Sequence, residues 1–392
     1  MTRQPILGKK PTYPTGRLRI LQTTDLHMHI LPYDYFSNRP DNSIGLIRLV
    51  DTISRLRLQP DVTTLLCDNG DTLQGNPLAD FLAQQIDDTA MHPMIAALNM
   101  LDYDAMTLGN HEFDYGLAFL RNALKDADFP IVSANIRSKT PPMLANPFAI
   151  LDRQIACDDG VTRLIKIGIT GFSPPQVADW DHNKHRDAVE ADDIVDAAQH
   201  IVPQMKAAGA DLIIALCHAG IADVAHTPRM ENAAIPLAGV DGIDVILAGH
   251  THETFPDPNG MLRPNVDLVN GALHEKPAVM ASFYGKALGI VDLSISCTQG
   301  KWQINDHAVH LERRSSPKLA NGPLQNALAE LIAVPHAATL AQTQQHIAST
   351  EIPIHSYFAT IRPDLSQQLL ARATQQAVQT AQYQLDTNPM LK

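Results

Sequence analysis

Hydrophobic and polar positions follow two periods along the first part of the chain. Short apolar runs bounded by polar or Gly-containing loops predict strands, and these runs are residues 17–23, 62–67 and 104–108. After each run, apolar residues recur at helical spacing, over residues 44–58, 92–101 and 115–124. Because strands and helices alternate, the pattern predicts a layered α/β domain with helices against a central sheet.

The middle of the chain continues this alternation. Further strands are predicted at residues 129–135, 163–172, 211–217 and 243–249, with helices at 193–209 and 231–239. Three more predicted strands, at 277–283, 287–296 and 301–311, follow one another with no helix between them. This change predicts that one part of the fold is antiparallel or belongs to a second sheet.

The character of the sequence changes after about Glu312. Two stretches rich in Ala, Gln and Leu, at residues 322–347 and 365–385, have a helical pattern. No strand pattern accompanies them, so they predict a helical C-terminal extension rather than a continuation of the sheet.

Polar side chains with metal-binding chemistry follow five of the predicted strands. They are Asp25 and His27, Asp71, the group Asn110, His111 and Asp114, His218, and the pair His250 and His252. A single His after a strand is more often a hydrogen-bonded loop residue than a ligand. Five such clusters at the same position of an open α/β sheet instead predict one site, because ligands bind beyond the carboxyl ends of the strands.

The ligand types and the composition narrow the chemistry of this site. Imidazole, carboxylate and amide oxygens suit Zn, Mn, Fe, Co or Ni better than Ca or Mg. None of the four cysteines belongs to the set, which disfavours a closed structural zinc site. The formal net charge of −12 disfavours a broad nucleic-acid surface, because phosphate backbones attract basic faces. There are more candidate ligands than one ion needs, so a shared carboxylate could bridge two ions.

The motifs DLHMH, NGDTLQG, GNHEFD, CHAG and GHTHE together resemble those of the calcineurin-like metallophosphoesterases. More narrowly, the chain resembles the 5′-nucleotidase family. Within that family it is most similar to the bacterial 2′,3′-cyclic-nucleotide 2′-phosphodiesterase/3′-nucleotidases, through DLHMHILPYDYF, DNGDTLQGNPLADF, HPMIAALNMLDYDAMTLGNHEFDYGL and KWQINDHAVHLERR. The resemblance covers the chain from Arg17 to the end.

This resemblance implies a four-layer α-β-β-α sandwich with mixed sheets, followed by the helical extension. It implies an N-terminal extension over residues 1–16 and a catalytic domain over 17–313. Residues 314–392 would be a helical linker and the start of a truncated nucleotide-binding domain.

The family's ligands transfer residue by residue onto the clusters. One divalent ion would be held by Asp25, His27, Asp71 and His252. A second would be held by Asp71, Asn110, His218 and His250, with Asp71 as the bridge. His252 is the least constant ligand, because some family members have Gln there.

His111 and Asp114 would assist the reaction without binding metal. Close relatives can have Asn in place of Asp114, and the carboxylate here is suited to fixing the tautomer of His111. Glu112 and Tyr115 are expected only to help start the following helix.

The resemblance implies a two-step hydrolysis in which a metal-bridging hydroxide attacks phosphorus. A 2′,3′-cyclic nucleotide would open to the 3′-nucleotide, which a second turnover would cleave to nucleoside and phosphate. The substrate would be a nucleotide or small phosphoester, with no nucleic-acid polymer or membrane as partner.

Several alternatives remain open at this stage. The chain could be a 5′-nucleotidase or nucleotide-sugar hydrolase of the same family, a nuclease, or a truncated module with only generic phosphodiesterase activity. A non-enzymatic binding module is the least favoured, because all the expected ligands are present.

The cellular location is open in the same way. The resemblance implies a periplasmic protein, whereas the N-terminal sixteen residues contain no apolar signal segment. The sequence would therefore predict a cytoplasmic protein if Met1 is the native start.

Overall fold

The computed structural model describes residues 13–85, 90–180, 188–222, 225–313 and 322–387. The chain forms two compact units, with the boundary between Leu340 and Ala341. The predicted N-terminal extension over 1–16 lies mostly outside the described residues, and so does the start of the predicted linker at 314.

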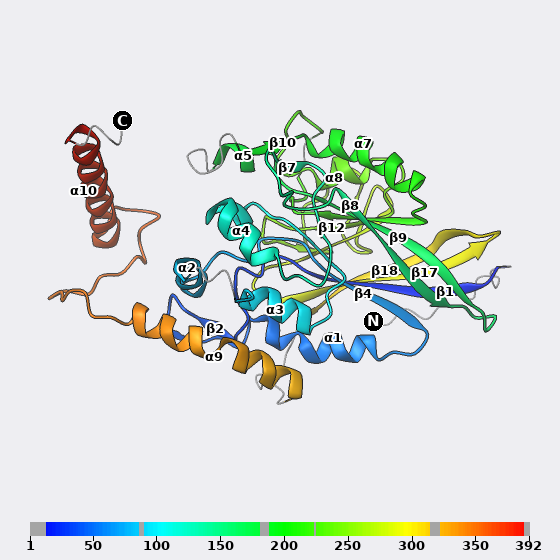
Figure 1. The fold of residues 1–392 in the computed structure, drawn as a ribbon, viewed down its shortest axis with the longest axis horizontal. Coiled ribbons are helices and arrows are strands. Elements are labelled where there is room, and N and C mark those ends of the chain that lie inside the picture. The colour runs from blue at the N-terminus through cyan, green and yellow to red at the C-terminus, as the bar shows by residue number, and fades with distance from the viewer. Residues whose placement is uncertain (1–12, 86–89, 181–187, 223–224, 314–321, 388–392) are drawn as a thin grey trace. The chain divides into compact units, whose positions relative to one another are not determined.

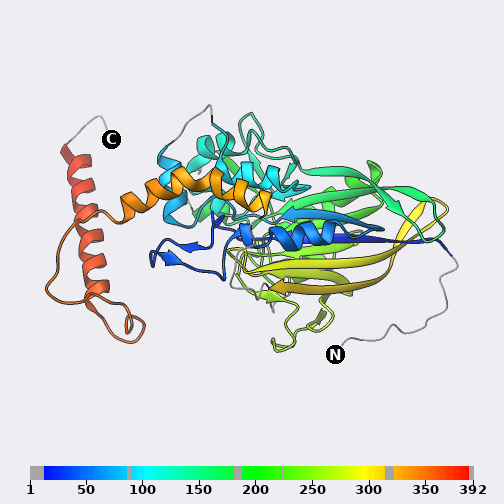
Figure 2. The same cartoon turned by 90° about the horizontal axis from the view of Figure 1, so that it is seen from below.

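Two mixed sheets form the centre of the first unit (Figures 1 and 2). In strand order, the first sheet contains β18 (Lys301–Arg313), β17 (Ala287–Thr298), β1 (Thr15–Thr23), β4 (Val62–Asp68), β5 (Ala105–Thr107) and β6 (Ile131–Val132). Its four strands from β1 to β6 are parallel, whereas β17 and β18 are antiparallel additions at one side. The three consecutive strands predicted at 277–283, 287–296 and 301–311 therefore belong to different sheets, because only the last two join this one.

The second sheet has the same mixed character. Its order is β14 (Val266–Asp267), β15 (Ala272–Leu273), β16 (Lys276–Ala281), β12 (Val245–Ala248), β11 (Leu212–Cys217), β9 (Thr162–Phe172) and β8 (Phe148–Ala156), with β13 (Thr254–Phe255) also on β16. The strands β9, β11, β12 and β16 are parallel, and antiparallel strands flank them. Two further short pairs complete the described strands, β2 (Tyr33–Asp34) with β3 (Arg39–Pro40) and β7 (Ile136–Ser138) with β10 (Val189–Ala191).

Three apolar layers separate the four structural layers. Leu65 on β4 and Ile214 on β11 belong to a cluster that fills the space between the two sheets. Their neighbours point the other way, because successive strand residues face opposite sides. Leu66 joins the cluster under the helices of the first sheet, and Ile213 joins the cluster under the helices of the second. The predicted α-β-β-α sandwich is therefore confirmed.

The helices divide between the two outer faces. The first sheet is covered by α1 (Val50–Arg57), α3 (Pro93–Met100), α4 (Gly116–Leu124) and α9 (Pro323–Thr343), with α2 (Pro77–Gln84) beside them. The second sheet is covered by α7 (Ile194–Ala207) and α8 (Ala234–Ala238). The first helix of the predicted C-terminal extension thus packs on the first unit through Leu328 and Ile332, which are fully buried.

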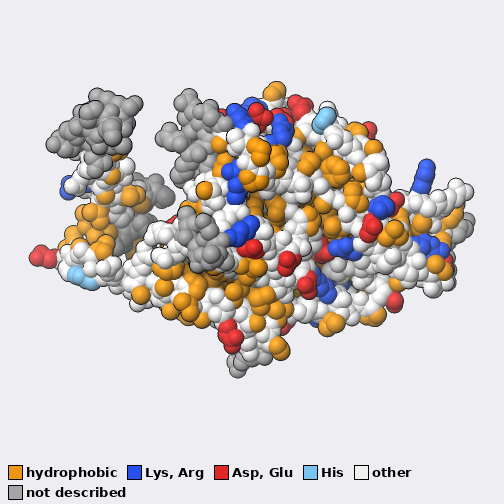
Figure 3. Space-filling model, viewed as in Figure 1, with side chains coloured by type: hydrophobic (Ala, Val, Ile, Leu, Met, Phe, Trp, Pro, Cys, Tyr) orange, Lys and Arg blue, Asp and Glu red, His pale blue; other side chains and the backbone are white. Residues whose placement is uncertain are grey.

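The outer side of α9 is less covered than its inner side. Val334 is 79% exposed, and Figure 3 shows hydrophobic side chains gathered over this helix. The second unit contains α10 (Leu365–Thr387), which exposes Leu369, Leu370 and Val378. None of the described helices is long and apolar enough to cross a membrane.

Candidate metal centre

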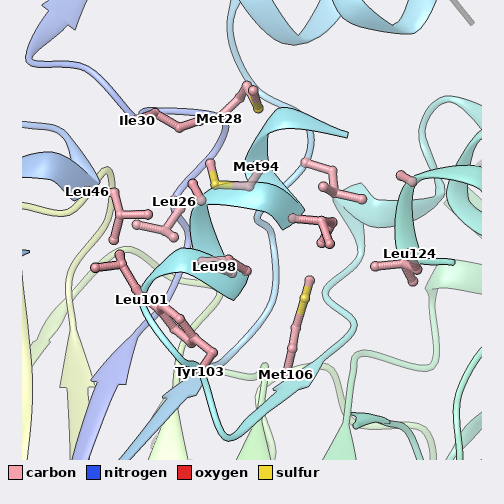
Figure 4. Close-up of a cluster of buried hydrophobic side chains, with 14 of the residues drawn as sticks. Leu26, Met28, Ile30, Leu46, Met94, Leu98, Leu101, Tyr103, Met106 and Leu124 are labelled. Atoms are coloured by element: carbon pink, nitrogen blue, oxygen red, sulfur yellow. The ribbon is translucent and has the colours of Figure 1, made fainter. Parts of the chain in front are cut away.

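The loop after β1 places polar and apolar side chains alternately. Leu26, Met28 and Ile30 have no exposed surface and enter the hydrophobic cluster that α3 covers (Figure 4). Asp25 and His27, on either side of Leu26 in sequence, belong to a buried polar group instead. The motif DLHMHI therefore fixes the direction of two candidate ligands by burying the residues that separate them.

The structure brings six of the predicted metal ligands into two groups. One group is Asp25, His27 and His252, and the other is Asp71, His218 and His250, with the candidate ligand atoms in each group within 4.8 Å of one another. Asp71 lies between the groups, since its Oδ2 is 3.0 Å from Nε2 of His218 and 3.9 Å from Nε2 of His27.

Three atoms at this centre are buried without a hydrogen-bond partner. They are Oδ1 of Asp25, Oδ1 of Asn110 and Nε2 of His218. The last atom is close to Asp71 Oδ2, but the two are not aligned for a hydrogen bond. Buried polar atoms are normally paired, and all three have lone pairs that a cation could accept. The residues present therefore fit a divalent metal site.

The second ring nitrogen of three histidines is held by a partner outside the two groups. Nδ1 of His27 is 2.7 Å from the carbonyl oxygen of Gln74, and Nδ1 of His218 is 2.7 Å from that of Asn69. Nε2 of His250 is 2.8 Å from Oε1 of Glu231. Such bonds fix the tautomer and leave the other nitrogen free to bind metal.

The charges of the centre favour a cation. Burial lowers the pKa of His218, but the charges of Asp71 and Asp25 raise it more, to about 10. Burial lowers the pKa of His250, and the charge of His218 lowers it further. Burial likewise lowers the pKa of His27 despite the charge of Asp71. Two buried carboxylates thus create an electronegative site, in which His218 keeps a proton that a metal ion would displace. Burial favours the neutral, metal-binding form of His250 and His27.

Glu112 joins the two loops that carry Asp71 and Asn110. It is completely buried, and its Oε1 accepts hydrogen bonds from the backbone N–H groups of Thr72 (2.6 Å) and Leu73 (3.1 Å). Its Oε2 accepts from the N–H groups of Asp71 (2.7 Å) and Gly109 (2.6 Å). The expectation that Glu112 only starts the next helix was therefore wrong, because its main contacts are about forty residues away in sequence.

The backbone at the centre is closely packed and unusual in conformation. Five of the predicted ligands have left-handed backbone, namely Asp25 (φ 52°), His27 (46°), Asp71 (54°), His250 (73°) and His252 (59°). Gly109 has no room for a side chain, since a Cβ there would lie 2.2 Å from Oδ1 of Asp71. Strained conformations of this kind concentrate at functional sites.

His111 and Asp114 form a pair at the edge of the centre. Nδ1 of His111 is 2.8 Å from Oδ2 of Asp114, and the backbone N–H of His111 donates to Oδ1 of Asp71. Burial lowers the pKa of His111, but the hydrogen bond to Asp114 and the charge of Asp71 raise it to about 9. The pair borders a pocket of about 460 Å³ that also includes Asn110 and Trp180.

The nine predicted site residues thus lie around one centre at the carboxyl ends of β1, β4, β5, β11 and β12. Sequence reasoning missed three residues that the structure places beside it, Glu112, Glu231 and Trp180. The signal for Glu112 was its position inside the GNHE motif, where a buried carboxylate could hold the turn. Glu231 lies in a loop and Trp180 ends the short helix α5 (Val177–Trp180), and neither segment has a distinctive local pattern.

Comparisons with known proteins agree with this geometry. The sequence profile of the family described as calcineurin-like phosphoesterase matches residues 18–254. The chain is 38% identical over 378 residues to the trifunctional nucleotide phosphoesterase protein YfkN of Bacillus subtilis, covering 94% of this chain and 25% of that protein. It is 36% identical over 363 residues to the 2′,3′-cyclic-nucleotide 2′-phosphodiesterase/3′-nucleotidase of Haemophilus influenzae, covering 91% of this chain and 55% of that one.

A solved structure supports the same relationship. The crystal structure of the calcineurin-like phosphoesterase YfkN from Bacillus subtilis superposes with a TM-score of 0.79 at 37% identity. The match covers 85% of this chain and all of that structure. The chain spans a quarter to about half the length of the two curated relatives.

Proposed function

The chain belongs to the calcineurin-like phosphoesterase family, and from this premise we propose that it hydrolyses 2′,3′-cyclic nucleotides to 3′-nucleotides. The same site then converts the 3′-nucleotide to nucleoside and phosphate. The substrate is inferred from similarity to the Haemophilus influenzae relative, whose name states this activity.

One observation carries this proposal, the convergence of three buried and unpaired ligand atoms with two ligand groups. In the proposal, Asp25, His27 and His252 would hold one divalent ion. His218, His250 and Asn110 would hold a second, and Asp71 would serve both. A carboxylate between two imidazole sets could serve both ions, and two such ions would clamp the attacking and leaving oxygens of a displacement at phosphorus.

When bound, the two ions supply Lewis acidity and lower the pKa of coordinated water. The chain's own residues supply and orient the acid that protonates the leaving group. Asp114 accepts the hydrogen bond from Nδ1 of His111 and stabilises the positive charge of the ring. His111 can then donate a proton from Nε2 to the departing ribose oxygen. A positioned acid of this kind contributes on the order of 10²–10⁴-fold.

The experiment is a comparison of four substrates with wild type and His111→Ala. Metal analysis after reconstitution with Mn²⁺ or Zn²⁺ should give two ions per chain in both proteins. Wild type should prefer 2′,3′-cyclic AMP and 3′-AMP over 5′-AMP, and the variant should lose most of this activity.

Other results would revise the proposal in defined ways. A preference for 5′-AMP would assign the chain to the 5′-nucleotidases. Activity on bis(p-nitrophenyl) phosphate alone would indicate a generic phosphodiesterase module. No bound metal and no hydrolysis would refute the proposed chemistry.

The domain division and the location follow as proposals from the same family relationship. The proposed division is a catalytic domain over residues 17–313 and a helical region over 314–392. The proposed location of the protein is the periplasm. Limited proteolysis tests the division, and fractionation of the native cells tests the location.

A further inference from the structure

His252 differs from the other three candidate histidine ligands in how its ring is held. The rings of His27, His218 and His250 each have one nitrogen bonded to an oxygen outside the ligand groups. Nε2 of His252 faces its own group, 3.0 Å from Nε2 of His27 and 3.4 Å from Oδ1 of Asp25. In the part of the chain that the structure describes, its Nδ1 has no hydrogen-bond partner. The orientation of this ring therefore needs another cause.

The pairing of β13 with β16 places the ring of Phe283 against His252. The two strands are antiparallel, and just beyond their last pair the backbone N–H of Ser282 donates to the carbonyl oxygen of Glu253 at 3.0 Å. The next pair in the same register is His252 with Phe283. Their rings are stacked, with centroids 4.6 Å apart and an interplanar angle of 18°. The contact thus follows from the sheet itself, because residues opposite each other on paired strands are neighbours.

The Phe283 ring is held by other side chains as well. The ammonium group of Lys286 lies over it, 3.4 Å from its centroid, where a cation is attracted to the ring. The ring of Tyr284 meets it edge to face, with centroids 4.6 Å apart and an angle of 79°. Tyr284 in turn stacks on the buried His29, and its backbone N–H donates to the carbonyl oxygen of Asp25 at 2.8 Å. Phe283 therefore offers His252 a fixed surface.

We propose that Phe283 is a positioning residue that holds the imidazole of His252 toward the metal centre. The flat face of its ring takes the place of the bond that orients each of the other three histidines. This inference rests on the proposed function, since it assigns a role at the same metal centre. Without the ring, the ion for which His252 is a candidate ligand should bind about 10-fold more weakly, as when a group that orients a metal-binding histidine is lost.

The first test titrates metal-free protein with Mn²⁺ and follows the electron paramagnetic resonance signal of the free ion. Phe283→Leu keeps an apolar side chain but has no flat face. It should weaken one of the two binding steps by about 10-fold and leave the other within about twofold of wild type. Phe283→Tyr keeps a ring and should retain both affinities. Phe36→Leu is the matched control, because Phe36 is 73% exposed, and it should change neither step.

A double-mutant cycle tests whether the effect acts through His252. His252→Ala should weaken the same binding step, and adding Phe283→Leu should weaken it no further. A further loss of about 10-fold in the double variant would show that Phe283 acts elsewhere, and it would overturn the inference. Equal weakening of both steps in Phe283→Leu would also overturn it, because a general loosening of the loops affects both ions.

The second test needs no metal. A ring stacked on an imidazole shields its carbon-bound protons, so those of His252 should resonate upfield in spectra of metal-free protein with labelled histidine. They should move downfield in Phe283→Leu and stay in place in Phe283→Tyr, with His252→Ala to assign them. An unchanged position in Phe283→Leu would overturn the inference. If wild type binds no metal, the proposed function fails, and these resonances alone decide whether Phe283 orients His252.

Discussion

Replacing Glu112 by Gln tests whether one buried carboxylate holds the metal centre together. The substitution changes the volume very little but converts one oxygen into an NH₂ group. Each oxygen accepts two backbone N–H groups, so either orientation of the amide leaves two buried donors without an acceptor. At about 1–3 kcal/mol for each unsatisfied donor, the free energy of unfolding should fall by about 2–6 kcal/mol.

This loss should be visible in thermal unfolding of the metal-free protein. For a domain of about 300 residues, a destabilisation of that order lowers the melting temperature by roughly 3–10 °C. Metal affinity should also fall, by about 10-fold to 100-fold, because Asp71 and Asn110 lose their common support. Differential scanning fluorimetry with EDTA measures the first effect, and metal titration measures the second.

Glu330→Gln is the matched control, since Glu330 is an exposed carboxylate on α9. It should change the stability by less than about 0.5 kcal/mol. A melting temperature of Glu112→Gln within about 1 °C of wild type, together with unchanged metal affinity, would refute the reasoning. In that case the four hydrogen bonds would contribute no net stability.

Three further changes test other parts of the centre. His111→Ala should lower kcat by about 10²–10⁴-fold while retaining metal, and loss of metal with the activity would instead make His111 structural. Gly109→Ala should abolish metal binding, because its Cβ would lie 2.2 Å from Oδ1 of Asp71; normal metal content by elemental analysis would contradict the geometry. Removing metal with EDTA should lower the melting temperature, and Mn²⁺ at one hundred times its Kd should restore about 2.7 kcal/mol. A melting temperature that does not depend on metal would favour a site without ions.

The sequence was sufficient to predict the layered fold and the location of the site. Parallel strands such as β4 and β11 appear as short apolar runs because both of their faces are buried. Polar residues directly after such runs must meet at one edge of the sheets. His218 and Asn110 could therefore be placed in one site without knowledge of the tertiary structure.

Some elements could not be predicted because their burial does not follow a simple period. β8 (Phe148–Ala156) was missed, since most of its residues are only partly buried and no alternation is visible. The strand predicted over residues 129–135 is shorter, Ile131–Val132. Beyond it, the side chain of Asn135 bonds to the carbonyl oxygens of Ser173 and Asp192 instead of continuing a ladder.

The supporting residues of the site were harder to predict than its ligands. Glu112 contacts Asp71 across about forty residues of sequence, and Glu231 contacts His250 across nineteen. Their roles depend on which loops become neighbours, which a local pattern does not contain. The candidate ligands stand out in the sequence because their chemistry is distinctive, whereas a carboxylate that holds a loop looks like any other acidic residue.

The loop after β1 shows how the fold maintains an unfavourable backbone at the centre. Asp25, His27 and Met28 all have left-handed backbone, which costs on the order of 1–3 kcal/mol for each residue. Burial of Leu26, Met28 and Ile30 contributes about 1.5–3 kcal/mol for each side chain, so the two effects are similar in size. The apolar half of DLHMHI therefore offsets the strain that its polar half requires. Because this balance lies within the chain itself, the side chains of Asp25 and His27 can be held in position without a bound ion.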